Sequence, residues 1–152
     1  MFEKHSSKYA DCINAIVIGE HWKLSVYEDY IGCLTFYPGP ESHSSYVDIG
    51  FATKKEYEDL ISLPGRALEF IKGTINNFTP GNINNLFHYY KTTDIKNFSG
   101  WHIEKQETGN EKKYIIGKSP VFLTVSEAAF EEFLSLLHET KVFFPEAIKK
   151  YS

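Results

Sequence analysis

Arginine and cysteine are scarce in this sequence, and each shortage excludes a class of function. Arg66 is the only arginine among the 16 basic residues, so planar guanidinium clamps for phosphate are almost unavailable. The 20 acidic residues give a formal net charge of -4, which argues against nucleic-acid binding because that needs a basic surface. Cys12 and Cys33, the only cysteines, lie in apolar runs, so we expect two reduced thiols in preference to a disulfide between neighbouring strands.

Long hydrophobic runs and an export signal are also missing. No stretch approaches the roughly 18 apolar residues of a membrane-spanning helix. The N-terminal residues MFEKHSSKYADC contain no apolar segment of the kind found in signal peptides. We therefore expect a cytoplasmic protein without a membrane partner. The length of 152 residues predicts one domain over residues 1–152, in which the polar residues 1–11 are loosely ordered.

Motifs of catalytic or metal chemistry are absent too. The six histidines never stand at the i, i+2 or i+4 spacing that chelates a metal on one element. No Gly-x-Ser-x-Gly elbow, phosphate-binding loop or dinucleotide fingerprint occurs. We predict a protein that is not an enzyme and that holds no cofactor or metal. An enzyme with dispersed catalytic residues, such as His43 or His102 beside a carboxylate, is an alternative.

The first third of the chain contains four short runs typical of β-strands. The second run alternates apolar and polar residues, the pattern of a strand with one buried face. Short polar connections and the breaker Pro38-Gly39-Pro40 separate the runs, so an antiparallel meander is predicted. The four predicted strands are Ile13–Ile18, Trp22–Tyr27, Ile31–Tyr37 and Tyr46–Ala52.

Helices are predicted in the middle of the chain. Thr53 stands three residues before Glu56, the spacing of a capping box, and Tyr57 and Leu60 follow on one helical face. Two further helical pieces are expected, one over residues 68–75 and one that Pro80 begins.

The last third combines strands with an amphipathic helix. The predicted strands are Trp101–Lys105, Tyr114–Ile116 and Val121–Val125. Thr124 and Glu127 again have capping-box spacing, and the following helix is expected to bury Phe130, Phe133, Leu134 and Leu137. The tail Val142–Ser152 contains Pro145 and is expected to add one last helical turn. The fold class predicted is α+β, with an antiparallel sheet of about six or seven strands and helices packed on one side.

Acidic residues form the best candidate for a binding surface. They crowd the first predicted helix and flank the hairpin over residues 101–116, where solvated faces are the simpler interpretation. Steering onto a basic protein partner is the functional one, with tyrosines as rigid anchors. The predicted partner-binding residues are Glu56, Tyr57, Glu58, Asp59, Glu104, Glu107 and Glu111, and the other candidate anchors are Tyr27, Tyr30, Tyr89 and Tyr90.

The closing pattern, from Phe122-Leu123-Thr124 through Glu127-Ala128 to Phe133-Leu134, is of a kind common in one family. With the short, mildly acidic and aromatic-rich composition, it resembles the immunity proteins of bacterial contact-dependent growth inhibition, a polymorphic toxin system. The resemblance implies a stoichiometric inhibitor that blocks the active site of a cognate toxin, often a basic nuclease. An inhibitor encoded by a phage would have the same physical profile.

A single-stranded nucleic-acid-binding sheet is the second alternative. The hairpin that runs into a helix also resembles the end of coactivator-type single-strand-binding domains. Its contacts would be Trp101, Lys112, Lys113, Tyr114 and Lys118. The net charge and the near absence of arginine count against it.

Overall fold

Eight strands and two helices make up the part of the chain that the structure describes. The structure is a computed structural model, and it describes residues 2–38, 46–63, 98–108 and 110–152. The strands form two antiparallel sheets, one of five strands and one of three. The α+β class predicted from the sequence is confirmed. The helical pieces predicted over 68–75 and after Pro80, and the candidate residues His43, Tyr89 and Tyr90, lie outside the described residues.

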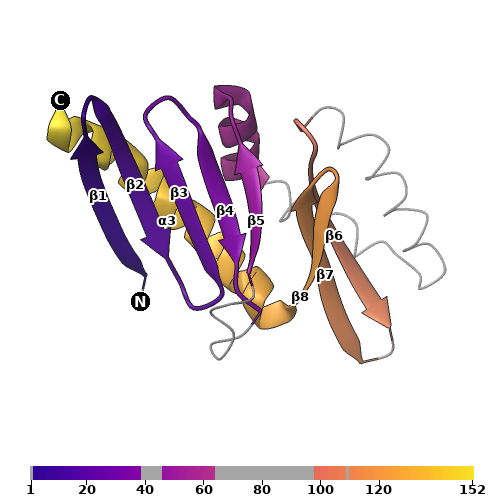
Figure 1. Ribbon diagram of the computed structural model, residues 1–152. Helices are drawn as coiled ribbons and strands as arrows, with labels where there is room; N and C mark the ends of the chain where they lie inside the picture. The colour runs from indigo at the N-terminus through magenta and orange to yellow at the C-terminus, as the bar shows by residue number, and fades with distance from the viewer. Residues whose placement is uncertain (1, 39–45, 64–97, 109) are drawn as a thin grey trace.

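The first sheet is a meander in which each strand pairs with the next along the chain (Figure 1). The predicted meander is confirmed, and one further strand precedes it. The prediction that residues 1–11 are loosely ordered is wrong for Glu3–Tyr9, which pair with the second strand from Glu3 opposite Ile18 to Tyr9 opposite Cys12. This edge strand has almost no buried side chain, so backbone hydrogen bonds hold it and no apolar pattern announces it. The strands are β1 (Glu3–Tyr9), β2 (Cys12–Ile18), β3 (Trp22–Tyr27), β4 (Gly32–Phe36) and β5 (Val47–Phe51).

The second sheet comprises the three strands predicted in the last third of the chain, all of them longer than expected. They are β6 (Trp101–Thr108), β7 (Glu111–Lys118) and β8 (Val121–Ser126). Lys118 pairs with Val121, so Ser119 and Pro120 form the hairpin turn between β7 and β8. The two sheets lie side by side, with β5 nearest to the second sheet (Figure 1).

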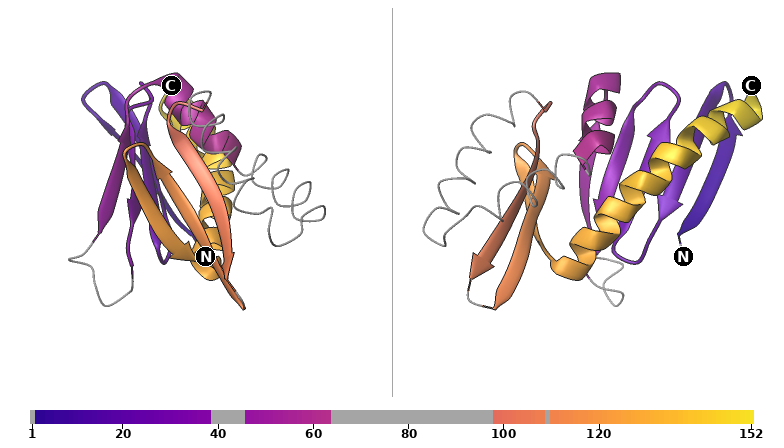
Figure 2. Two further views of the ribbon diagram at one scale, coloured as in Figure 1. Left: turned by 90° about the vertical axis from the view of Figure 1, so that its right-hand side faces the viewer. Right: turned by 180° about the vertical axis from the view of Figure 1, so that it is seen from behind.

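Helix α3 (Glu127–Tyr151) follows β8 directly and crosses one side of the first sheet (Figure 2). The predicted cap at Thr124 is wrong, because β8 continues to Ser126, whose hydroxyl accepts a hydrogen bond from the Ala129 N–H at 3.2 Å. The tail Val142–Ser152, expected to add one last helical turn, belongs almost entirely to this helix, which runs through Pro145. Phe144 and Ala147 are buried on either side of this proline, so packing outweighs its unfavourable effect on the helix.

One apolar core joins both sheets to the helices. Trp22, fully buried on β3, lies against Phe36 and Phe133 with ring centroids 4.7 and 5.0 Å apart. The core reaches the second sheet where the Tyr114 ring stacks on Phe130 at 3.9 Å. The buried residues of α3 are Ala129, Phe130, Phe133, Leu136, Leu137, Thr140, Phe144 and Ala147. Leu134, predicted on this face, is only partly buried.

The short helix over 54–63 has the predicted capping box. The Glu56 N–H donates to the Thr53 hydroxyl at 3.1 Å, and that hydroxyl donates to the Glu56 carboxylate at 3.1 Å. The indole N–H of Trp101 donates to the Glu56 carbonyl at 2.9 Å. This bond ties the short helix to the start of the second sheet.

The Glu132 carboxylate ties α3 to the turn between β2 and β3. Its two oxygens accept the backbone N–H groups of Glu20 at 3.1 Å, His21 at 2.8 Å and Trp22 at 2.9 Å. The Trp22 indole N–H donates to the Ala129 carbonyl at 2.7 Å, one helical turn away. A side chain at Gly19 would place its Cβ 2.7 Å from a Glu132 oxygen, so this approach requires glycine at that position.

Replacing Glu132 with alanine should lower the free energy of unfolding by about 2 kcal/mol, because three backbone N–H groups lose a charged acceptor. Glu131→Ala is the matched control, because the Glu131 side chain is exposed and its loss should change stability by less than about 0.5 kcal/mol. Urea unfolding of both variants measures the difference. Equal losses in the two variants would contradict the role given to the carboxylate.

Candidate functional site

The acidic residues predicted to bind a partner do not form one exposed surface. Glu56 lies between its own capping box and Lys118, whose Nζ is 2.8 Å from the carboxylate. Partial burial acts to raise the pKa of Glu56, but hydrogen bonds from Lys118 and Thr53 and the Lys118 charge outweigh it and leave the pKa below its ordinary value. Glu56 therefore joins the short helix to the second sheet.

Tyr57, predicted as an anchor for a partner, lies in the interior. Its ring contacts Tyr30 and Phe144, with centroids 5.4 and 5.3 Å apart. Burial, and then the neighbouring Tyr30 phenol, raise the pKa of Tyr57 well above its ordinary value. Tyr30, the second predicted anchor, belongs to the same internal cluster. Of the predicted anchors in the described residues, Tyr27 alone is exposed.

Glu58 and Asp59 are paired with lysines, and Glu104 lies in the interior. Glu58 is exposed and 3.8 Å from Lys54, while Asp59 accepts from Lys55 at 2.9 Å and from the Ser99 hydroxyl at 2.6 Å.

Glu104 is only 2% exposed and lies 3.2 Å from the equally buried His102. The backbone of Glu107 stands opposite Lys112 in the ladder between β6 and β7, and Glu111 begins β7.

The side of the first sheet opposite α3 is a better candidate. Figure 1 looks onto this side, and Figure 2 shows α3 across the other. The cross-strand pairs Ile16 with Ser25, Ser25 with Cys33 and Cys33 with Gly50 form one row on it. In the described part of the chain no helix lies on this side, which we call the open face. Its residues are Glu3, His5, Ser7, Tyr9, Cys12, Asn14, Ile16, Ile18, Lys23, Ser25, Tyr27, Ile31, Cys33, Thr35, Tyr46, Asp48 and Gly50.

A hollow with a volume of about 390 Å³ lies on the open face. Small side chains form part of its lining, and the Thr35 hydroxyl in this lining donates to Asp48 at 2.7 Å. The lining residues are Lys23, Ser25, Tyr27, Ile31, Gly32, Cys33, Thr35 and Asp48. A Cβ added at Gly50, beside the hollow, would meet only the Gly32 carbonyl oxygen at 3.9 Å. The space above this glycine is therefore open.

Large hydrophobic side chains are exposed on the open face, and two of them, Tyr27 and Ile31, line the hollow. Tyr9 is 87% exposed, Tyr27 40%, Ile31 49% and Tyr46 55%, and these are four of the seven exposed large hydrophobic residues in the described part of the chain. Tyrosine combines an apolar ring with a hydrogen-bonding hydroxyl and is enriched where proteins bind one another. The sequence does not predict this face, because alternation in β3 identifies one buried side and does not show whether the other side is covered.

Most of the residues proposed to contact nucleic acid are buried or ion-paired within the protein. Trp101 is fully buried, Tyr114 is 5% exposed, and Lys118 is paired with Glu56. Neither ring can therefore stack on a base.

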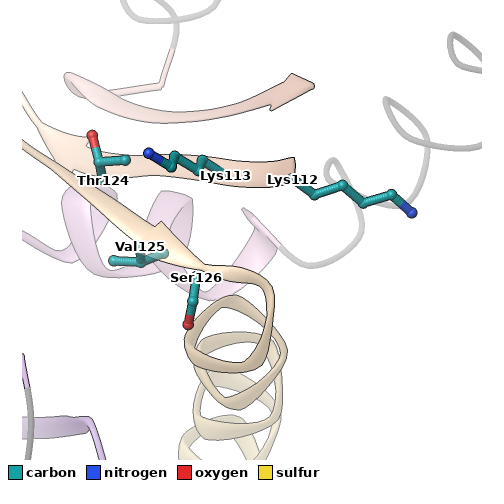
Figure 3. Close-up of a pocket in the computed structure, with 5 residues that line it drawn as sticks. All are labelled: Lys112, Lys113, Thr124, Val125 and Ser126. Carbon is teal, nitrogen blue, oxygen red and sulfur yellow. The ribbon is translucent and has the colours of Figure 1, made fainter. Parts of the chain in front are cut away.

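Lys112 and Lys113 lie beside a hollow of ≈ 340 Å³ at the start of α3, which Thr124, Val125 and Ser126 complete. The two lysine side chains point in opposite directions (Figure 3), so they do not form a clamp around one anion.

In the described part of the chain, two cysteines and one group of acidic and histidine side chains could bear on catalysis or metal binding. Cys12 and Cys33 are free thiols, as predicted. Burial is the main cause that raises the pKa of Cys33, which makes it a poor nucleophile. Glu20, His21 and Glu132 could bring three ligand atoms within 4.8 Å of one another, but Glu132 already accepts three backbone N–H groups.

Comparison with protein-family models, with curated proteins and with solved structures finds no match to this chain. Neither helix in the described residues combines the length and the apolar character needed to cross a membrane.

Lowering the pH should destabilise the fold as Glu56 becomes protonated. A carboxylate whose pKa is lowered by folding stabilises the protein above its unfolded pKa, about 4.3, and this contribution is lost as the pH falls through the folded value. Lys118→Met should lower the unfolding free energy at pH 7 by about 1 kcal/mol and weaken the dependence on pH below about 4. Lys54→Met, which removes an exposed pair with Glu58 and the contact of Lys54 Nζ with the Tyr30 ring, is the control and should leave the pH dependence nearly unchanged. Urea unfolding at pH 7 and pH 3 tests this; identical pH profiles for Lys118→Met and the wild type would contradict it.

The reactivity of the Cys12 thiol should depend on the negative charges near it on the open face. Partial burial, and then the negative charges of Asp29 and Glu28, raise the pKa of Cys12. Asp29→Asn should therefore increase the rate of Cys12 alkylation by iodoacetamide at pH 8 by about twofold, because more thiolate is present. Cys33, whose pKa is raised in part by Asp48, should keep its rate in this variant. Peptide mass spectrometry resolves the two sites, and an unchanged Cys12 rate would speak against the effect.

Proposed function

We propose that the protein is a stoichiometric protein-binding inhibitor that engages its partner through the open face. The observation that carries the proposal is the set of exposed large side chains, two of them lining a hollow, on a sheet face that no described helix covers. Soluble proteins seldom expose grouped large apolar side chains without a use for them.

The other side of the same sheet explains why this face is suited to binding. The five strands are held by their backbone ladders and by α3 packed behind them, so the side chains of the open face have a rigid support. Interfaces that need little reorganisation lose less conformational entropy on binding. Tyrosines on such a support can act as anchors, because each ring has few rotatable bonds for its contact area.

The narrower form of the proposal is a cytoplasmic immunity protein whose cognate toxin, a nuclease for example, is inhibited when its active site is covered. The resemblance described above supports it, as does the absence of a catalytic constellation from the described residues. An immunity protein has to bind and needs no chemistry of its own.

A blocking substitution on the open face tests the proposal. Gly50→Trp should fold normally, because the added side chain enters open space, and it should reduce partner affinity at least tenfold by covering the hollow. Gly50→Ala, which adds only a methyl group, is the matched control and should retain binding. Tagged wild type and variants are used to capture proteins from the source cells after nuclease treatment, with thermal unfolding as the check on folding.

The proposal requires one protein retained in stoichiometric amount by the wild type and by Gly50→Ala, and lost from Gly50→Trp. The partner would then be purified and its activity measured with increasing amounts of the protein, and inhibition should be complete near a 1:1 ratio. Equal retention by folded Gly50→Trp would overturn the role of the open face. A bound partner whose activity is unaffected would overturn the inhibitor function.

A further inference from the structure

The outer edge of β1 offers a regular row of backbone groups to another strand. β1 is the first strand of the five-stranded sheet, and its ladder with β2 runs without interruption from Glu3 to Tyr9. Edge strands are commonly kept short or interrupted by a bulge or a proline, because free backbone groups pair readily with another chain. β1 has neither a bulge nor a proline, and almost all of its side chains are exposed.

The backbone groups of Lys4, Ser6 and Lys8 point away from β2. The Ile13 carbonyl accepts from the Glu28 N–H at 3.0 Å, and the Ile13 N–H donates to the Glu28 carboxylate at 3.2 Å. Ile13 stands opposite Lys8, so this pair is not hydrogen-bonded, and every second pair of an antiparallel ladder shares that state. The N–H and carbonyl groups of Lys4, Ser6 and Lys8 therefore line the edge.

The last turn of α3 reaches this edge from one side of the sheet. The Tyr151 hydroxyl donates to the Ser6 carbonyl at 3.0 Å, and this carbonyl keeps a second lone pair for an incoming N–H. The end of α3 extends past β1 in Figure 1 and in the right-hand view of Figure 2. Ile148 and Tyr151, three residues apart on this turn, are only partly buried, so a further strand would complete their burial.

The charge beside the Lys8 half of the edge is positive on the α3 side. Lys8 stands opposite the buried Ile13 and is exposed. Lys149 and Lys150 are exposed in the last turn of α3. The exposed carboxylates here are those of Glu146, on the preceding turn, and Asp11, in the turn beyond β1. The ammonium groups outnumber them.

The other charges near β1 are paired or more distant. Lys4 is 2.7 Å from Glu139, and Glu3, on the open face, is 3.6 Å from His5. The more distant carboxylates lie two strands inward from the edge, about 10 Å, or two turns before Glu139 on α3, about 12 Å. They belong to Glu28, Asp29 and Glu131.

A second copy of this chain is a poor occupant for the edge. The longest antiparallel pairing of two β1 strands is centred on Ser6, and it would place Lys4 of one copy opposite Lys8 of the other. Like charges directly opposite one another destabilise an antiparallel pair. A segment with carboxylates on the α3 side would instead form charge-assisted hydrogen bonds with the lysines.

We propose that the edge of β1 binds an extended acidic segment of another protein as a sixth strand of the first sheet. The backbone of the segment pairs with Lys4, Ser6 and Lys8, and its carboxylates lie next to Lys8 and the last turn of α3. This inference goes beyond the proposed function, because the edge is separate from the hollow on the open face.

A peptide of about eight residues that alternates glutamate and threonine tests the inference, because in a strand all of its carboxylates can face α3. It is labelled with fluorescein and titrated into the full-length protein at low salt, and binding is followed by anisotropy. A peptide that alternates lysine and threonine should bind at least about tenfold more weakly. Amide exchange followed by NMR should slow at Lys4, Ser6 and Lys8 in the complex, and it should not change at Ser7, which already pairs with β2.

A proline at the edge blocks strand addition without breaking the ladder behind it. Ser6→Pro removes an N–H that β2 does not use, so the variant should fold, and it should weaken binding of the acidic peptide at least about tenfold. Ser6→Ala keeps the N–H and is the matched control, with an affinity within about twofold of the wild type. Thermal unfolding confirms that each variant is folded.

Charge variants keep the test valid if Ser6→Pro fails to fold. Lys8→Glu should weaken binding at least about fivefold, because it places like charges opposite one another. Lys112→Glu makes the same change in net charge at an exposed position of β7 and should weaken binding by no more than about twofold. Gly50→Trp, which covers the hollow, should bind the peptide as the wild type does.

Equal weakening by Lys8→Glu and Lys112→Glu would overturn the inference, because the peptide would then respond to net charge alone. Unchanged affinity in folded Ser6→Pro, or unchanged exchange at Lys4, Ser6 and Lys8, would overturn strand addition. Loss of the peptide from Gly50→Trp would place it on the open face and overturn the inference as well. A wild-type dimer in sedimentation that Ser6→Pro dissociates would assign the edge to a second copy instead of an acidic partner.

Discussion

The fold depends on how α3 is fixed to the first sheet, and Glu132 makes the most specific contact. One carboxylate accepts three consecutive backbone N–H groups of the β2–β3 turn, and the neighbouring Trp22 indole returns a hydrogen bond to the helix. Apolar burial supplies most of the attraction but is not directional. The hydrogen bonds define which point of the helix meets the turn, and Gly19 provides the space that they need.

Other acidic residues also have structural partners, which explains why charge was a poor guide to the binding surface. Glu56 caps a helix and pairs with Lys118, Asp59 accepts two hydrogen bonds, and Glu104 is buried next to His102. Each of these residues looks like a surface charge in the sequence. Their partners come from other elements, so their structural roles appear only when those elements are packed. The exposed Tyr27 of the open face, by contrast, alternates with core residues of β3 and resembles a half-buried strand residue.

Secondary structure was predicted best where side-chain periodicity and packing agree. The alternation of β3 and the apolar run of β2 led to correct strands, and the Thr53 cap is the one predicted. The predictions were wrong where backbone pairing or side-chain burial acts without the support of the local sequence pattern. β1 is held by backbone pairing with little burial, and α3 continues through Pro145 because Phe144 and Ala147 are buried around it. Thr124 has the spacing of a cap, but it still belongs to β8 when the chain reaches Ser126.

The sequence by itself determined the α+β class, most of the strands and the set of side chains that share each face of the sheet. It determined these because strand and helix periods are local properties of the backbone. Only the tertiary structure decided which face of the first sheet is covered, and that tyrosines on the other face stay exposed. The covering helix begins more than 100 residues after the turn that it contacts, as the separation of 110 between Trp22 and Glu132 shows. No local pattern encodes a contact over that distance; it is selected by the packing of the whole core.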